Sequence, residues 1–332
     1  MTATPGKRLG GRSTSALGVG CWAIGGPWVS DGRPAGWGEV DDEVSIRMIH
    51  TAVDAGIRLL DTADVYGAGH SEVVIGEALR RLPSSVRGEV MVSTKFGNRF
   101  DETTRVGGSQ DVTPAVVRDA CDGSLRRLGV EALDLLQLHG GANTQAAAED
   151  VVATLEQLVA EGKVKEFGTA VDAPEMIATF GKSAAISVQS QINVFGHNPE
   201  VLTAAHEQDF AVLARTPLAM GLLTGKYNLS NRPGEDDVRR DTPWWTYFDD
   251  DAMADWLRRL EAVRELLTTD GRTLTQGALA YLWALDPLII PLPGARTPAQ
   301  VTEHAAAITF GPLPNATRQE IDALLADSPE RS

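Results

Sequence analysis

The stretch Leu59-Leu60-Asp61-Thr62-Ala63-Asp64-Val65-Tyr66-Gly67 decides how the rest of this chain can be interpreted. A short apolar run ends there in an acid, and a tyrosine follows five positions later. Two later apolar runs, 90–94 and 133–138, also end in a polar group, Lys95 and His139 respectively. One such residue at a strand end is usually a solvated terminus, but three in succession indicate one catalytic face.

Composition excludes several classes of protein. The 332 residues are 43% hydrophobic and 23% charged, as in globular proteins, and the net charge of −15 argues against nucleic-acid or anionic-membrane partners. No apolar run approaches the ~20 residues of a membrane span, and the first residues lack an apolar signal region. Cys21 and Cys121 form no disulfide framework, which suits the cytoplasm. Without a His-x-His pair or a Cys-x-x-Cys motif, no metal site is predicted.

Apolar runs alternate with helical patterns along the chain. The eight predicted strands cover residues 16–22, 59–61, 90–95, 133–139, 163–170, 185–189, 210–215 and 288–291. A hairpin with a Gly10-Gly11 turn precedes them, and a long insertion, from Thr216 to about Asp270, separates strand seven from helix seven. This pattern predicts one (β/α)₈ TIM barrel that forms a single domain over residues 1–332. A doubly wound sheet would require a Gly-x-Gly-x-x-Gly turn after the first strand, which Gly18-Val19-Gly20-Cys21-Trp22 does not supply.

In such a barrel the carboxyl ends of the strands form the active-site face. Asp61, Lys95 and His139 then converge, and Tyr66 lies on a loop beside them. A nearby ammonium lowers the pKa of a phenol, and a carboxylate keeps the ammonium charged. A histidine near the same oxygen can orient a carbonyl. The set can therefore protonate a carbonyl oxygen while a hydride arrives at carbon.

These motifs closely resemble those of the aldo-keto reductases over nearly the whole chain. The similarity lies in residues 61–72, in Ser93-Thr94-Lys95 and in residues 133–139. It implies that Tyr66 is the general acid, that Lys95 and Asp61 lower its pKa, and that His139 orients the carbonyl. The implied function is reduction of an aldehyde or ketone, a small-molecule substrate, by NADPH.

Two further segments resemble the cofactor-binding motifs of that family. Residues 216–227 are similar to its pyrophosphate-covering loop, and residues 293–304 are similar to its adenosine site, where Arg296 would suit the 2′-phosphate of NADP(H). The cofactor-binding residues predicted in this way are Trp22, Asp61, Gln189, Arg215, Thr216, Leu218, Gly221, Lys226, Gly294, Arg296, Gln300, Glu303 and His304.

The chain departs from the family pattern at three places. Ala170 and Val171 stand where relatives carry the Ser and Asn that hold the nicotinamide carboxamide, so that Thr169 or Gln189 would have to supply this contact. Arg215 replaces an aromatic residue that stacks on the nicotinamide, although a guanidinium can stack too. His304 replaces an Asn that meets adenine. None of these changes touches the tetrad, which we define as Asp61, Tyr66, Lys95 and His139.

Tryptophans on the predicted face indicate where the substrate binds. The predicted substrate residues are Trp22, Trp28, Tyr66, His139, Trp244 and Trp245. Trp244 and Trp245 lie in the insertion, where they either form a mobile lid over a bulky sugar- or polyketide-like ketone or only pack the loop onto the barrel. Asp236 and Asp237 are interpreted as solvated charge.

The sequence leaves two other functions open. The chain could be an NADP(H)-binding regulatory or sensing subunit with negligible turnover, because the carboxamide contacts are altered. It could also reduce an activated C=C bond beside a carbonyl. The sequence leaves open whether the chain forms a homo-oligomer.

Overall fold

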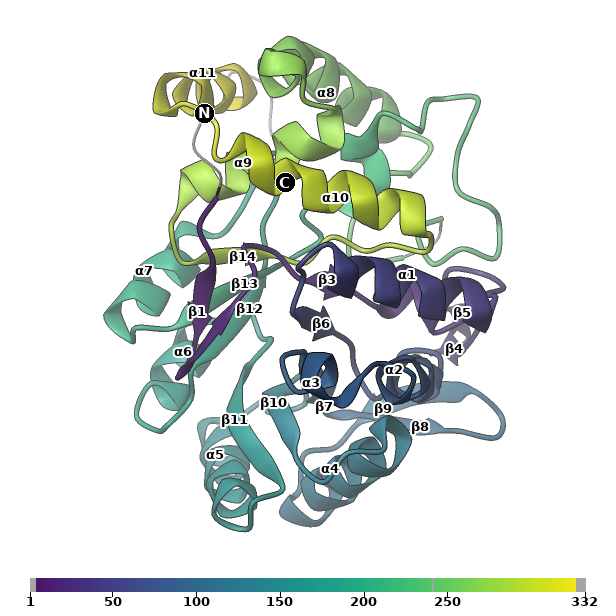
Figure 1. Ribbon diagram of the computed structural model, residues 1–332, viewed down its shortest axis with the longest axis vertical. Helices are drawn as coiled ribbons and strands as arrows, with labels where there is room; N and C mark the ends of the chain where they lie inside the picture. Colours follow the sequence, from purple (N-terminus) through teal and green to yellow (C-terminus); the bar gives the residue numbers. More distant parts are fainter. Residues whose placement is uncertain (1–3, 241, 327–332) are drawn as a thin grey trace.

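A closed barrel of eight parallel strands forms the centre of the protein, in a computed structural model that describes residues 4–240 and 242–326 (Figure 1). In chain order its strands are β3 (Val19–Gly20), β6 (Leu59–Asp61), β7 (Met91–Phe96), β10 (Leu133–Leu138), β11 (Val164–Thr169), β12 (Ser187–Gln191), β13 (Ala211–Arg215) and β14 (Ile289–Pro291). They are hydrogen-bonded in that order from β3 to β14. The ring closes where Gly18 N donates to Pro291 O at 2.9 Å and Gly20 N donates to Pro293 O at 3.0 Å. The predicted barrel is confirmed.

Helices surround the barrel, and local sequence signals set many of their ends. They are α1 (Asp42–Asp54), α2 (His70–Arg80), α3 (Ser84–Arg87), α4 (Pro114–Leu128), α5 (Gln145–Ala160), α6 (Pro174–Phe180), α7 (Pro199–Glu207), α8 (Met253–Leu267), α9 (Leu274–Leu285), α10 (Pro298–Phe310) and α11 (Asn315–Ala326). The capping boxes predicted at Thr273 and Thr297 are present at the starts of α9 and α10. None of the helices in the described part of the chain combines the length and apolar character that crossing a membrane needs.

The hairpin lies against the barrel as the sequence predicts. Strands β1 (Lys7–Leu9) and β2 (Arg12–Thr14) pair in antiparallel fashion around Gly10, whose φ of 56° favours glycine. Leu9 is fully buried and packs with Leu59, Met91 and Leu135 from the barrel strands. This apolar cluster leaves the polar strand ends as the face on which a site can form.

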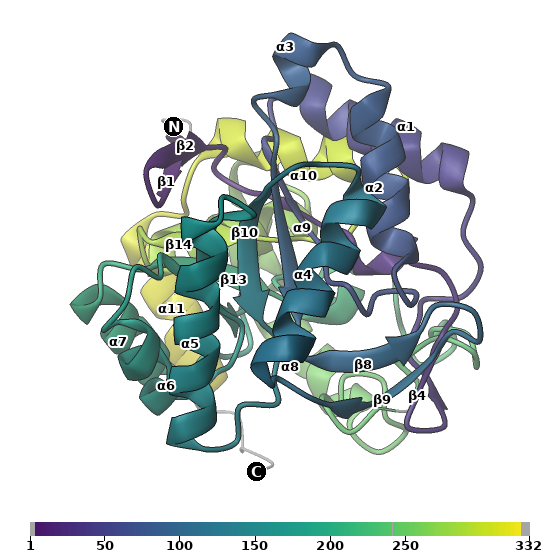
Figure 2. The same ribbon diagram turned by 90° about the horizontal axis from the view of Figure 1, so that it is seen from below.

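Two of the larger features of the structure are absent from the predicted pattern. The first is an accessory sheet of four strands in the order β5-β4-β9-β8, made of β4 (Val29–Ser30), β5 (Arg33–Pro34), β8 (Asn98–Asp101) and β9 (Val106–Gln110), which Figure 2 shows at one side of the barrel. The second is α8, inside the insertion. The strands were missed because they are short and mostly polar, without the alternation that predicts a half-buried strand.

Candidate active site

The strand ends β6 and β7 bring a lysine and an aspartate together under the cavity floor. Lys95 is fully buried, and its Nζ donates to Asp61 Oδ2 at 2.7 Å and to the Thr62 carbonyl at 2.6 Å. From β12, Gln189 Nε2 donates to the other carboxylate oxygen, Asp61 Oδ1, at 2.8 Å. Both oxygens of Asp61 thus have donors, which fixes the direction in which the ammonium points.

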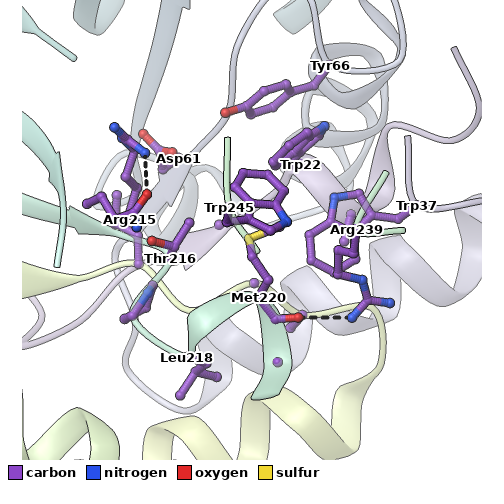
Figure 3. A pocket seen from close by; sticks show the side chains of 18 of the residues that line it. Trp22, Trp37, Asp61, Tyr66, Arg215, Thr216, Leu218, Met220, Arg239 and Trp245 are labelled. Atoms are coloured by element: carbon purple, nitrogen blue, oxygen red, sulfur yellow. Dashed lines mark hydrogen bonds between the residues drawn. The ribbon is translucent and has the colours of Figure 1, made fainter. Parts of the chain in front are cut away.

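Tyr66 lies above this pair, in the turn that follows β6. Its ring stacks on Trp22, with centroids 5.4 Å apart and an interplanar angle of 16°. Lys95 Nζ is 5.3 Å from the centre of the phenol ring, and His139 meets the ring edge-on at 5.8 Å. Figure 3 shows the Tyr66 hydroxyl directed to the side of the cavity where Asp61 and Arg215 lie. The structure therefore brings the four predicted tetrad residues together.

Burial and charge set the protonation states of these groups. Burial raises the pKa of the Tyr66 phenol, and the Lys95 ammonium opposes that rise without cancelling it. The predicted lowering of this pKa by Lys95 is present, but the Asp61 carboxylate acts in the opposite direction and desolvation is the largest effect, so that the pKa lies above its usual value. Burial alone would lower the pKa of Lys95, but the attraction to Asp61 and Tyr66 and the hydrogen bond to Asp61 together outweigh burial, and the pKa is raised. Burial and the nearby cations Lys95 and Arg215 lower the pKa of His139 to about 3, so its imidazole is neutral.

A cavity of about 900 Å³ opens over this floor. Of the predicted site residues, only Lys95 lies outside its lining, buried beneath Tyr66. The lining includes the predicted residues Trp22, Trp28, Asp61, Tyr66, His139, Gln189, Arg215, Thr216, Leu218, Gly221, Lys226, Trp244, Trp245, Gly294, Arg296, Gln300, Glu303 and His304. Residues far apart in the chain thus share one volume large enough for a cofactor and a substrate together.

The loop after β13 has an unusual backbone. Thr216, Ala219 and Met220 have φ values of 52°, 46° and 56°, and Gly221 follows with 98°. Left-handed conformations at residues other than glycine cost about 1–3 kcal/mol each and cluster at ligand clamps. Backbone of this kind forms concave N–H sites for anions, and Lys226 on the same loop lines the cavity. These features fit a pyrophosphate.

The far end of the cavity lies at the start of α10. His304 is 3% exposed, and no described residue bonds its buried Nδ1. Burial lowers the pKa of His304 to about 4, so it is a neutral group that suits an adenine base. The Gln300 side chain accepts from the backbone N–H of Arg296 at 2.8 Å and thereby shapes this turn. Glu303 accepts from the Thr273 hydroxyl at 2.6 Å and holds α9 against α10.

Arg296 makes contacts that its sequence position did not indicate. Its Nη1 donates to the Trp37 carbonyl at 2.8 Å, and its Nη2 donates to the Glu39 carbonyl. Arg296 therefore holds the loop around Trp37 over the cavity. A 2′-phosphate at this place would have to share the guanidinium with these carbonyls.

The insertion contributes a buried ion pair that corrects the interpretation of Asp237 as solvated charge. Asp237 is 9% exposed, and its carboxylate accepts from Arg239 Nε at 2.8 Å and from Nη2 at 2.6 Å. Arg239 Nη1 also donates to the Met220 carbonyl at 3.0 Å, a bond drawn in Figure 3, and its guanidinium lies 4.3 Å from the Trp37 ring centre. Arg239 thus connects three segments of the chain: its own part of the insertion, the left-handed loop at residues 216–221, and the loop that carries Trp37.

Sequence reasoning missed several residues that line the cavity. They are mainly Ser30, Asn98, Gln110, Asp172, Gln191 and Arg239. Asn98 and Gln110 come from the accessory sheet, whose existence was not predicted. The one available signal was the position of Gln191 and Asp172 shortly after the ends of predicted strands, on the face where the tetrad lies.

The two tryptophans of the insertion differ in burial. Trp245 is 8% exposed and meets Trp22 edge-on at 6.0 Å, whereas Trp244 is 55% exposed. Tyr247 is also buried, and its hydroxyl accepts from Asn193 Nδ2 at 3.0 Å. Trp28 packs against Ala35, Ala63 and Val65, so most of its side chain is held in a hydrophobic cluster that forms part of the cavity wall. Only Trp244 keeps the exposure expected of a lid.

Comparison with known proteins assigns this constellation to a family. The family model described as "Aldo/keto reductase family" matches residues 16–326, and the chain belongs to that family. It is 32% identical over 308 residues to the NADH-specific methylglyoxal reductase of Escherichia coli (89% of this chain, 90% of that protein). It is 27% identical over 327 residues to "Aldo-keto reductase yakc [NADP(+)]" of Schizosaccharomyces pombe (96% and 90%). The glycerol dehydrogenase structure from Gluconobacter oxydans superposes with a TM-score of 0.82 at 31% identity, with 98% of each chain covered.

Proposed function

We propose that this protein reduces an aldehyde or ketone to an alcohol with NADP(H), and that Tyr66 is the general acid. The observation that carries the proposal is the buried Lys95–Asp61 pair at 2.7 Å beneath Tyr66, on the floor of a cavity of about 900 Å³. Burial raises the pKa of Tyr66, which keeps the phenol protonated and able to give its proton.

Each residue around the substrate carbonyl has a separate role in the reaction. Tyr66 donates a proton to the carbonyl oxygen, and the Lys95 ammonium stabilises the phenolate that is left. Asp61 and Gln189 hold Lys95 in place. The neutral imidazole of His139 orients the same oxygen by a hydrogen bond. The reduced nicotinamide supplies the hydride to the carbonyl carbon.

The left-handed loop at residues 216–221 and the start of α10 would hold the cofactor. Lys226 would supply a cation to the pyrophosphate, and His304 would meet the adenine. Arg296 would supply a cation to the 2′-phosphate, which would favour NADPH over NADH. The buried and unpaired Cys21 and Cys121 support a reducing compartment, the cytoplasm.

The substrate is a carbonyl compound with hydrogen-bonding substituents, of sugar-like or polyketide-like size. Trp22, Trp28 and Trp244 line one part of the cavity, and the amides of Asn98 and Gln110 line another. Aromatic faces suit the apolar face of such a molecule, while amides suit its hydroxyl groups.

The test is oxidation of NADPH in the presence of a panel of aldehydes and ketones, with Tyr66→Phe as the matched control. Tyr66→Phe keeps the shape of the ring and removes the proton, so turnover should fall by roughly 10²–10⁴-fold while NADPH affinity changes little. Near wild-type turnover in Tyr66→Phe would refute the role of Tyr66. A wild-type protein that binds NADPH and turns over no carbonyl would refute the enzymatic function.

A further inference from the structure

A second cavity lies beside the cavity of the tetrad, where the insertion meets the connection between β12 and α7. Its volume is about 470 Å³, within the usual range of small-molecule sites. Residues 195–198 form one part of its lining, and residues 243–247 with Trp256 of α8 form another. The residues proposed to hold the pyrophosphate and the adenosine lie outside this lining, so a bound cofactor leaves the second cavity free.

The second cavity adjoins the first at the two tryptophans of the insertion. The ring of Trp22, which stacks on the tyrosine of the tetrad, has its centroid 6.5 Å from that of Trp244 and 6.0 Å from that of Trp245. A substrate whose carbonyl group lies at the tetrad can therefore extend past these rings. The residues that line both cavities are Asp172, Gln191, Trp244 and Trp245.

Aromatic rings form much of the wall of the second cavity. The centroids of Phe195 and Trp256 are 5.3 Å apart, and those of Tyr247 and Trp256 are 5.0 Å apart. Phe195 and Trp256 are only partly buried, and Trp244 is 55% exposed. Large rings that keep accessible faces around one hollow provide surfaces on which the apolar face of a ligand can pack.

The polar groups among these rings are neutral or already paired. Asp172 is the one charged side chain among the described residues that line this cavity, and Arg215 neutralises it. Burial lowers the pKa of His197, so its imidazole is neutral near pH 7 and offers one donor and one acceptor. Asn198 Oδ1 accepts from the Glu200 N–H at 2.9 Å, which leaves the Nδ2 group for other partners. The cavity therefore suits an uncharged ligand that has both apolar faces and hydroxyl groups.

We propose that the second cavity binds a glycosyl ring of the substrate while the carbonyl group lies at Tyr66. The C–H groups on one face of the sugar pack on the aromatic rings, and its hydroxyl groups form hydrogen bonds with His197 and Asn198. A purely apolar ring would leave these polar side chains without partners, which costs free energy. The proposal rests on the proposed function and names its substrate class, an aldehyde or ketone that carries a linked sugar.

The test compares three aldehydes that share one reacting group. para-Methoxybenzaldehyde has no second ring, para-cyclohexyloxybenzaldehyde has an apolar ring, and para-formylphenyl β-D-glucopyranoside has a sugar ring of similar size. Each carries an oxygen atom on the benzene ring, so the reactivity of the three carbonyl groups is similar. The meta isomers are measured as well, because the second ring then leaves the benzene ring in another direction. Oxidation of NADPH gives kcat/KM for each compound.

Wild type should reduce the glucoside with a kcat/KM roughly 10-fold above that of the methoxy compound, the effect of one or two neutral hydrogen bonds. The cyclohexyl compound should show a clearly smaller gain. Gly196 lines the second cavity, its φ is not left-handed, and a Cβ there would meet no atom within 4 Å. Gly196→Trp should therefore fill the cavity and remove the gain for the glucoside, with kcat/KM for the methoxy compound unchanged.

The chain offers a matched control for this substitution. Gly234 is an exposed glycine of the insertion with the same free space and no left-handed φ, and it lines neither cavity. Gly234→Trp should leave all three kcat/KM values at those of wild type. His197→Phe keeps a ring and removes both nitrogens, so it serves if Gly196→Trp does not fold. It should lower kcat/KM for the glucoside by roughly 3- to 10-fold and leave the cyclohexyl compound unaffected.

Three results would overturn the proposal and leave the proposed function intact. Equal kcat/KM values for the three compounds, in both the para and the meta series, would mean that the second ring is not bound. Equal gains for the glucosyl and cyclohexyl compounds would mean that the cavity binds an apolar ring. A gain that persists in Gly196→Trp would place the sugar elsewhere. By contrast, a wild-type protein that reduces none of these aldehydes and no other carbonyl compound would refute the proposed function as well.

Discussion

The floor of the cavity and its outer wall are built on different principles. On the floor, Asp61, Lys95 and His139 come from strand ends, and hydrogen bonds among buried groups fix Lys95 and Asp61. On the wall, residues 216–240 and 242–252 follow no repeated pattern, and long-range contacts such as Arg239 with Met220 and Trp37 hold them. The difference teaches that barrel strand ends are positioned by the fold itself, whereas the wall depends on individual side-chain pairs.

The stability of the floor should depend strongly on the balance of charge between Lys95 and Asp61. Lys95→Met leaves Asp61 as an unpaired buried carboxylate, which should lower the free energy of unfolding by about 3–5 kcal/mol and abolish turnover. The double variant Lys95→Met/Asp61→Asn removes the stranded charge, so it should regain most of the stability and remain inactive. Urea unfolding and NADPH oxidation measure the two effects. An active double variant would show that the pair has only a structural role.

The two tryptophans of the wall should separate packing from substrate contact. Trp245→Ala opens a cavity at a side chain that is 8% exposed, so the free energy of unfolding should fall by about 3–5 kcal/mol. Trp244→Ala removes an exposed ring and should change stability by no more than about 0.5 kcal/mol. It should raise the Michaelis constant for a large ketone and leave that for a small aldehyde unchanged. Equal effects of Trp244→Ala on both substrates would refute a role for Trp244 as a lid.

Replacing Arg296 should show whether its main role is to bind the cofactor or to hold the loop around Trp37. If it binds the 2′-phosphate, Arg296→Ala should cost about 1.5–3 kcal/mol of NADPH affinity and leave NADH affinity nearly unchanged. If its bonds to the Trp37 and Glu39 carbonyls are its main role, both cofactors should weaken alike. Fluorescence titration with the two cofactors distinguishes these outcomes.

Buried histidines on the floor and at the adenosine end should make stability depend on pH. Their pKa values are lowered to about 3 for His139 and about 4 for His304, whereas an unfolded histidine has a pKa of ~6.5. Below pH ~6.5 the unfolded chain therefore binds protons that the folded chain does not, and stability falls as the pH decreases. Each histidine should contribute about 1.4 kcal/mol per pH unit until its folded pKa is reached. Urea unfolding at about pH 7 and about pH 5 should show a smaller change in His304→Asn, and an unchanged slope would contradict this account.

The sequence by itself determined the barrel and the residues of its floor. Apolar runs with a helical pattern between them predict alternating strands and helices, and a parallel barrel places every strand end on one face. Asp61, Lys95 and His139 therefore had to converge. Capping residues such as Thr273 and Thr297 act within one turn of helix, so their effect could also be predicted locally.

Only the tertiary structure decided which side-chain contacts hold the wall and how the pKa values of the groups on the floor are shifted. Asp237 follows another acid in a polar segment, and nothing nearby in sequence indicates that it is buried in a pair with Arg239, whose guanidinium packs on Trp37. The pKa of Tyr66 is raised because desolvation outweighs the Lys95 ammonium, a balance that depends on packing in three dimensions. The bond between Arg215 and Asp172 joins residues 43 positions apart in the chain. Such contacts follow from burial and distance between elements, which periodicity along the chain does not encode.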